Sequence, residues 1–146
     1  MTIRRAGPDD FPRVRDLDLG PDMTTERDTI YAVFFRLFPE LCLVDEDADG
    51  GLVGFALGAL SSDRRESYLH DLWVRPDARG LGRGRELLFR YLDESRGLGA
   101  ARVSLVSHSA AAYYLRLGFR LATSVDDLYV DELASHRQMS LLFLDL

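Results

Sequence analysis

The chain has 146 residues, 47% of them hydrophobic, and its 18 basic and 24 acidic residues give a formal net charge of -6. This length predicts one domain over residues 1–146, with enough apolar residues for one core. The acidic balance argues against a nucleic-acid partner, which requires a basic face. The single cysteine, Cys42, excludes an intrachain disulfide and is expected to be buried.

Targeting and metal signals are missing from the sequence. The first residues, MTIRRAGPDD, lack the apolar region of a signal peptide, and no apolar run approaches the ~18 residues of a membrane span. We therefore expect a cytoplasmic protein without a membrane partner. His70, His108 and His136 lie far apart, without metal-ligand spacing, so no metal site is expected.

Residues 1–40 predict one strand followed by two helices. The strand covers residues 2–6, and the first helix begins at Asp9 or Asp10, residue types that cap helices. The second helix lies within residues 24–40 and ends before Pro39. Its spacing predicts one apolar stripe made of Ile30, Val33, Phe34, Leu37 and Phe38.

The rest of the chain predicts further strands interleaved with two helices. Residues 41–60 read as a hairpin around an Asp-Gly-Gly turn, with Gly54 and Gly58 marking a bulge in its second strand. Residues 66–74 form the next strand, and a helix follows over about residues 84–96. The stretches ARVSLV, HSAAAYYLRLG, FRLATS and RQMSLLFLDL predict strand, helix, strand and strand. This order indicates an α/β (α+β) fold with a mixed sheet.

A glycine-rich loop, residues 79–84 (RGLGRG), joins the strand of residues 66–74 to the following helix. Amides without side-chain cover can surround phosphate oxygens, and the start of a helix favours an anion. Arg79, Arg83 and Arg85 add positive charge there. The spacing fits neither a Walker A loop nor G-x-G-x-x-G. Taken alone, the loop is also compatible with a turn that binds no ligand.

Two stretches resemble the GNAT superfamily of acetyl-CoA-dependent N-acyltransferases. VRPDARGLGRG is similar to the family's pyrophosphate-binding segment, [Q/R]-x-x-G-x-[G/A], with matches at Arg79, Gly82 and Gly84. SAAAYYLRLGF is similar to the family's A-x-x-x-Y-x-x-x-G-F block, with matches at Ala110, Tyr114, Gly118 and Phe119. The resemblance implies a mostly antiparallel central sheet splayed at strands 4 and 5, helices on both faces, and acetyl-CoA as cosubstrate.

The same resemblance assigns roles to individual residues. Those expected to contact the cofactor are Leu72, Trp73, Val74, Arg79, Gly80, Leu81, Gly82, Arg83, Gly84, Arg85 and Ser107, the last where many members carry Asn. His108 is a further candidate contact. Tyr114 matches the family's general acid, which protonates the departing thiolate; simple packing beside Tyr113 is the alternative.

The base is less well defined by the sequence. YLHDLWVRP is most similar to the polyamine and diamine acetyltransferase branch, in which glutamate stands at the position of His70. His70 is nevertheless a candidate base because imidazole titrates near neutral pH. Asp71 and a water chain are alternatives, as is a purely structural histidine. Strand alternation places His70 and Asp71 on opposite faces unless a bulge intervenes.

The expected activity is acetyl transfer to a primary amine by direct attack through a tetrahedral intermediate. A small cationic amine is the favoured acceptor, since acidic side chains gather in the segments that bind acceptors in this family: Asp18, Asp22, Glu26, Asp28 and residues 126–132. The alternative is that these acidic side chains lie in solvated loops and bind no acceptor. A protein amine and a non-catalytic CoA-binding module are the alternatives. Homodimers are frequent in the family, and the apolar segment 139–146 is compatible with such an interface.

Overall fold

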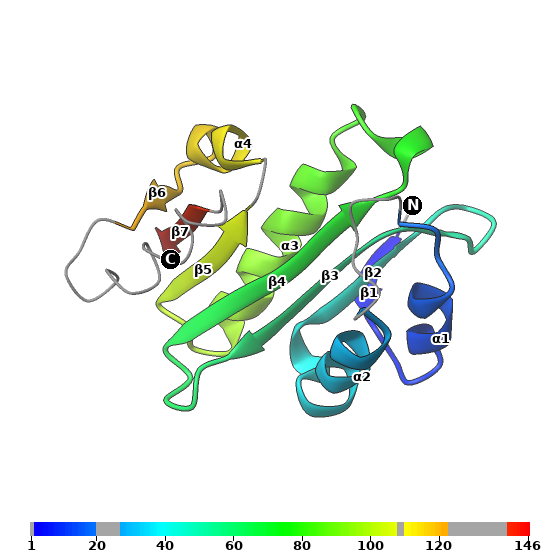
Figure 1. Ribbon diagram of the computed structural model, residues 1–146, viewed down its shortest axis with the longest axis horizontal. Coiled ribbons are helices and arrows are strands. Elements are labelled where there is room, and N and C mark those ends of the chain that lie inside the picture. The colour runs from blue at the N-terminus through cyan, green and yellow to red at the C-terminus, as the bar shows by residue number, and fades with distance from the viewer. Residues whose placement is uncertain (1, 20–26, 108–109, 123–139) are drawn as a thin grey trace.

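The computed structural model describes residues 2–19, 27–107, 110–122 and 140–146. The predicted order of strands and helices is confirmed (Figure 1). The elements are β1 (Thr2–Arg5), α1 (Asp10–Arg15), α2 (Arg27–Leu37), the 3-10 turn η1 (Pro39–Leu41), β2 (Cys42–Glu46), β3 (Leu52–Leu60), β4 (Glu66–Val74), the 3-10 turn η2 (Pro76–Ala78), α3 (Arg83–Gly97), β5 (Arg102–Ser107), α4 (Ala111–Arg116), β6 (Arg120–Leu121) and β7 (Ser140–Asp145).

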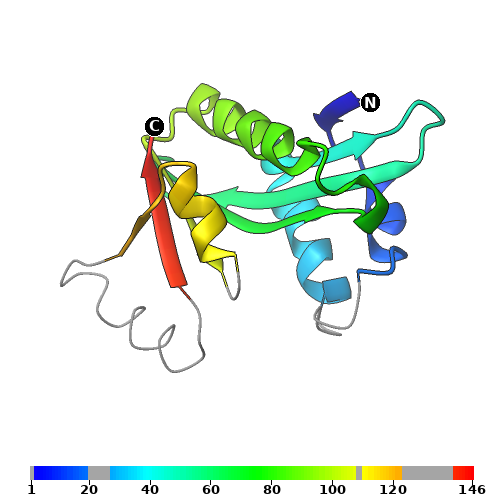
Figure 2. The same ribbon diagram turned by 90° about the horizontal axis from the view of Figure 1, so that it is seen from above.

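The strands form one seven-stranded sheet in the order β1-β2-β3-β4-β5-β7-β6. Only β4 and β5 pair in parallel, which confirms the mixed, mostly antiparallel sheet. Helix α3 covers one face, and α1 and α2 cover the other (Figure 2). Each face carries its own apolar core, centred on Leu87, Leu88 and Tyr91 on the α3 side and on Tyr31, Phe55 and Leu57 on the α2 side.

The sheet opens between β4 and β5, as the resemblance implies. Their parallel pairing begins at Glu66 and Arg102 and ends at Leu69 and Leu105. The remaining residues of β4, 70–74, have no partner on β5, although β3 still pairs with the other edge of residues 71–74. One edge of β4 is therefore unpaired along the second half of the strand.

A bulge in β4 lies where this opening begins. Leu57 of β3 pairs with Asp71 and Gly58 pairs with Leu69, so His70 has no partner on β3. An extra residue places two successive side chains on one face of the sheet. The His70 ring stacks on Phe34 of α2, and the Asp71 carboxylate also contacts α2. Simple alternation fails here. The bulge predicted in β3 at Gly58 lies instead in the partner strand β4, whereas β3 has its own extra residue, Val53, beside Gly54.

Close approach of α3 fixes the bulge in place. The Tyr91 hydroxyl donates to the Tyr68 carbonyl at 2.9 Å and is 2.6 Å from the Ser67 hydroxyl. A Cβ on Gly58 would lie 1.9 Å from that Tyr91 hydroxyl and 2.6 Å from the Tyr68 carbonyl. Only glycine leaves the space in which Tyr91 reaches β4.

The predicted apolar stripe of α2 is wrong in part. Tyr31 and Phe34 are buried against the sheet, whereas Ile30, Val33 and Leu37 are exposed. At about 100° per residue, Tyr31, Phe34 and Phe38 share one helical face, and the exposed residues belong to the neighbouring face. The aromatic side chains reach across to β3 and β4, and this contact decides which face is buried.

Other sequence-based expectations have mixed outcomes. Cys42 is buried as expected, and burial raises the pKa of its thiol to about 12.

Helix α3 includes Gly97 and is followed by Gly99, whose φ of +95° is left-handed. Gly99 rather than Gly97 therefore marks the end of the helix. Residues 123–124 and 137–139 of the last two predicted strands lie outside the described residues. No helix in the described ranges is long and apolar enough to cross a membrane.

Replacing Gly58 with alanine is expected to lower the free energy of unfolding by about 3 kcal/mol, because the new methyl group displaces Tyr91 from β4. Gly97→Ala is the matched control: a Cβ there meets no heavy atom within 4 Å. Because alanine favours helices, that variant should gain up to ~1 kcal/mol. Urea denaturation measures both. Equal stabilities of the two variants would contradict the role given to Gly58.

Candidate active site

A groove of about 700 Å³ lies between the end of β4, the glycine loop and α4. Its lining residues are Leu72, Trp73, Val74, Arg79, Gly80, Gly82, Arg83, Gly84, Arg85, Ala110, Tyr113 and Tyr114. The structure thus brings most of the predicted cofactor contacts together with the predicted acid, although they come from separate parts of the sequence. Leu81, Ser107 and His70 do not line the groove.

The unpaired edge of β4 forms one wall of this groove. Backbone N–H and C=O groups along Leu72, Trp73 and Val74 face no strand on the β5 side. A free strand edge can pair with an extended ligand as it would with another strand. The Arg79 side chain closes the end of this edge, because its Nε donates to the Val74 carbonyl at 2.7 Å.

The glycine loop has the backbone geometry of an anion cradle. Gly80 and Gly82 have φ values of +76° and +83°, a conformation that residues with a side chain rarely adopt. Helix α3 then begins at Arg83 without a side-chain cap. The first amides of a helix have no partner within the helix, so they are available to a bound diphosphate. The residues present therefore fit the pyrophosphate of coenzyme A.

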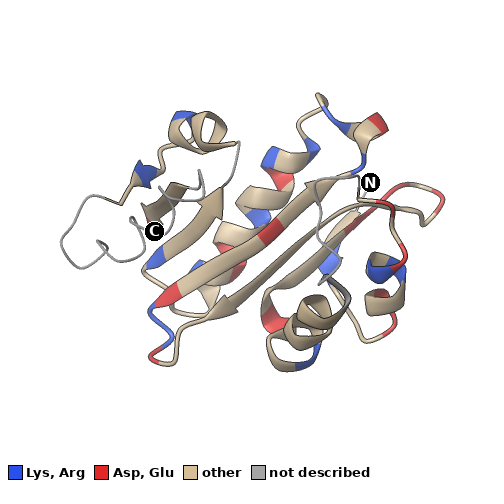
Figure 3. Ribbon diagram, in the orientation of Figure 1, with Lys and Arg blue, Asp and Glu red and all other residues tan. Residues whose placement is uncertain are grey.

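Arginines surround this loop, and positive residues gather around the start of α3 (Figure 3). Their side chains nevertheless differ in what they bind. The Arg83 guanidinium pairs with the fully buried Asp45 of β2 and with Glu86, leaving 11% of its side chain exposed. Arg83 therefore ties α3 to the sheet, and its charge is already compensated. Arg85 lies over the Phe89 ring at 5.1 Å and makes no ion pair within the described residues.

Two predicted cofactor contacts lie apart from the groove wall. Leu81 is 67% exposed at the tip of the loop. Ser107 is buried, and its hydroxyl accepts a hydrogen bond from the Ala110 amide at 2.9 Å. Ser107 therefore positions the start of α4, whose preceding residue Ala110 does line the groove. His108 and His136 lie outside the described residues.

Tyr114 packs among aromatic side chains and also lines the groove. Its ring packs against Tyr113 and Phe119, with centroids 5.3 and 5.4 Å apart, and the residue is 8% exposed. Burial, with smaller contributions from Tyr113 and the charge of Asp71, raises its pKa to about 12. A protonated phenol is a hydrogen-bond donor. Tyr114 is thus a packed side chain that carries a donor at the groove.

His70 and Asp71 lie together on the α2 side of the bulge. The His70 ring stacks on Phe34 with centroids 4.7 Å apart. Burial lowers the pKa of His70 and raises that of Asp71, and the interaction between the two groups opposes both shifts. The charge of Asp71 also contributes to the raised pKa of Tyr114, so the two groups interact electrostatically.

Sequence reasoning missed two features of this region. The hydroxyl of Tyr31 on α2 donates to Asp71 Oδ2. The indole Nε1 of Trp73 is buried without a hydrogen-bond partner among the described residues, while its ring stacks on Phe55 at 5.7 Å. The apolar stripe predicted for α2 did not include Tyr31, and helical spacing carries no signal for what a tyrosine hydroxyl binds.

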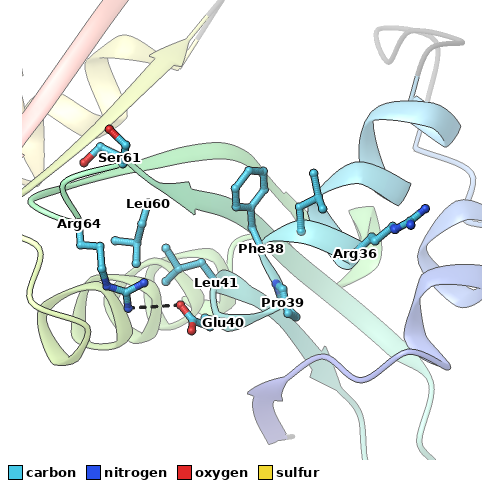
Figure 4. A pocket seen from close by; sticks show the side chains of 10 residues that line it. Arg36, Phe38, Pro39, Glu40, Leu41, Leu60, Ser61 and Arg64 are labelled. Atoms are coloured by element: carbon cyan, nitrogen blue, oxygen red, sulfur yellow. Dashed lines mark ion pairs between the residues drawn. The ribbon is translucent and has the colours of Figure 1, made fainter.

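A second hollow, of about 520 Å³, lies where α2 and η1 meet the β3–β4 turn (Figure 4). Arg64 and Glu40 form an ion pair of 3.5 Å within it. None of the predicted site residues lines this hollow, so the groove beside the glycine loop is the candidate site. No group of three or more potential metal ligands occurs among the described residues.

Gly82→Ala is expected to weaken binding of coenzyme A roughly 5–30-fold, because alanine at this φ is strained by about 1–2 kcal/mol and shifts the loop amides. Gly50→Ala is the matched control: its φ is +82°, it also has nothing within 4 Å, and it lies in the β2–β3 turn. Isothermal titration calorimetry measures both affinities. The loop assignment is wrong if the two variants bind coenzyme A equally well.

Comparisons with known proteins agree with the geometry. The model of the acetyltransferase (GNAT) family matches residues 10–119. Blasticidin-S acetyltransferase of Streptomyces morookaense is 31% identical over 130 residues, which are 86% of this chain and 85% of that protein.

Two solved structures share the fold. Ard1 from Thermoplasma volcanium matches with a TM-score of 0.76 and 24% identity, over 99% of this chain and 97% of that one. N-acetylglutamate synthase from Neisseria gonorrhoeae, complexed with coenzyme A and N-acetyl-glutamate, matches with a TM-score of 0.75 and 22% identity. That match covers 99% of this chain and 35% of the longer synthase chain. The chain belongs to the GNAT family, as an acyltransferase that uses acetyl-CoA.

Proposed function

We propose that this acetyltransferase acetylates a primary amine of a small cationic molecule. The observation that carries the proposal is the half-buried carboxylate of Asp71, which has no arginine partner among the described residues and whose charge acts on Tyr114. A partly desolvated carboxylate without an arginine partner favours a positively charged ligand. The similarity to an acetyltransferase whose name specifies blasticidin S supports a small-molecule acceptor.

In the groove, both backbone groups and side chains are suited to bind acetyl-CoA. The edge of β4 at residues 72–74 is suited to the extended pantetheine arm, and the amides from Gly80 to Arg85 are suited to the diphosphate. Arg85 supplies positive charge beside the loop, because the charge of Arg83 is already paired with Asp45. Bound there, acetyl-CoA would supply the thioester carbonyl that the amine attacks, and the C–S bond breaks after the C–N bond has formed.

The bulge residues prepare the amine. An alkyl ammonium has a pKa of ~10.4 and must lose a proton before it attacks. In our proposal Asp71 binds the ammonium and His70 takes the proton, because burial lowers the pKa of His70 and keeps its ring neutral. Positive charge then stays beside Asp71 both before and after the proton moves.

Tyr114 acts on the leaving sulfur. Its pKa of about 12 keeps the phenol protonated at neutral pH. An ordinary thiol has a pKa of ~8.5, so complete proton transfer from the phenol to a relaxed thiolate is unfavourable. Tyr114 therefore contributes mainly by donating a hydrogen bond to sulfur while negative charge develops there, and a buried site strengthens such a bond.

Acetyl transfer measured by mass spectrometry tests this proposal. The panel comprises blasticidin S, spermidine, short diamines, aminoglycosides, amino acids and lysine peptides, which also tests the predicted likeness to polyamine and diamine acetyltransferases. We expect transfer to one class of small cationic amine. Tyr114→Phe should lower kcat about 10²–10³-fold and leave the affinity for coenzyme A unchanged, since it removes only the donor.

Other results would point elsewhere. Acetylation of the peptides alone would replace the small acceptor with a protein amine. Binding of coenzyme A without transfer to any member would favour a non-catalytic CoA-binding module. Full activity of Tyr114→Phe would remove the tyrosine from the chemistry and leave it a packing residue.

A further inference from the structure

We propose that Tyr31 is a positioning residue for acceptor binding: its hydroxyl holds the Asp71 carboxylate in place and favours its charged form. This inference rests on the proposed function, in which Asp71 binds the ammonium of the acceptor. It assigns a role in substrate selection to a core residue of α2, a helix that does not line the groove for acetyl-CoA.

The position of the Tyr31 ring is fixed by packing. The residue is 1% exposed, and its ring meets Phe55 of β3 edge-on, with centroids 5.6 Å apart. From this anchored ring the hydroxyl donates to Asp71 Oδ2. The bond joins α2 to β4 beside the bulge, and the carboxylate cannot rotate without losing it.

The bulge is what brings Asp71 within reach of Tyr31. With regular alternation, His70 and Asp71 would lie on opposite faces. Because His70 is the extra residue of β4, both side chains lie on the α2 face. Asp71 pairs with Leu57 of β3, so the neighbouring strand brings no charged side chain to it.

Among the residues that the structure describes, four titratable groups act on Asp71 or feel its charge. They are His70 and Tyr68 of β4, Tyr31 of α2, and Tyr114 of α4. Of these, only Tyr31 donates a hydrogen bond to the carboxylate within the described parts of the chain. Burial alone favours a neutral carboxyl group, whereas a hydrogen bond to the carboxylate favours the charged one.

This balance decides which acceptors the site can hold. A charged Asp71 attracts an ammonium, whereas a neutral carboxyl group in the same place does not. The Tyr31 hydroxyl opposes the effect of burial and so keeps Asp71 charged at lower pH. The site can therefore select cationic amines down to a lower pH than it could without this hydroxyl. The residue thus acts on the acceptor through Asp71 and not by touching the reacting atoms.

The test removes the hydroxyl and keeps the ring, using Tyr31→Phe in the full chain. In a ¹³C NMR titration of the side-chain carboxyl groups, the Asp71 pKa should rise by about 1 unit, the loss expected for one hydrogen bond to a charged group. The pH below which the acceptor KM rises should move up by the same unit, so at pH values below the Asp71 pKa of both proteins the variant's KM should be roughly 10-fold higher with little change in kcat. At pH values above both pKa values the KM of the variant should return to that of the wild type, because Asp71 is charged in both proteins.

Ser95→Ala is the control. It also removes a buried hydroxyl, but from the α3 face and away from the bulge, where the Ser95 hydroxyl donates to the Ser67 hydroxyl at 3.0 Å. This variant should be less stable while the Asp71 pKa and the acceptor KM stay at the wild-type values. Wild-type affinity for coenzyme A in both variants shows that the groove is intact.

Three outcomes separate the inference from the function on which it rests. An unchanged Asp71 pKa in Tyr31→Phe overturns the inference, and the NMR titration needs no activity to show it. A raised pKa with an unchanged acceptor KM also overturns it and leaves Tyr31 a structural residue. A wild-type KM in Asp71→Asn instead removes Asp71 from acceptor binding, and so contradicts the proposed function itself.

Discussion

The site depends on one irregularity in the backbone, the extra residue His70 in β4. The bulge exists because Tyr91 reaches from α3 to the Tyr68 carbonyl through space that Gly58 leaves open. A bulge bends its strand, and pairing with β5 stops at Leu69, immediately before it. The same residue therefore opens the sheet on one edge and places His70 and Asp71 together on one face.

The opening separates the groove that fits acetyl-CoA from the residues proposed to bind the acceptor, which lie on the α2 side of the sheet. The glycine loop, the free edge of β4 and Tyr114 border the groove that fits acetyl-CoA. His70, Asp71 and Tyr31 lie on the α2 side, where the proposed acceptor binds. A chain with a net charge of -6 can still bind an anionic cosubstrate, because backbone amides and Arg85, which makes no ion pair with any described residue, provide the local attraction.

Local sequence patterns predicted much of this arrangement. The bounds of β4 and the glycine loop could be predicted because strand and helix periodicity change there, and Tyr114 because its block has fixed spacing. Features that depend on contacts between distant segments could not be predicted from the sequence. The buried pair of Arg83 with Asp45 and the bond from Tyr31 to Asp71 leave no periodic signal. The buried face of α2 was assigned wrongly for the same reason, since aromatic reach to the sheet outweighed apolar spacing.

A crystal structure with bound coenzyme A tests the central claim most directly. The account predicts the diphosphate against the amides of residues 80–85 and the pantetheine arm along residues 72–74, with the sulfur between Tyr114 and Asp71. Coenzyme A bound in the hollow beside Glu40 and Arg64, or a β4 strand paired with β5 beyond Leu69 in the complex, would contradict it.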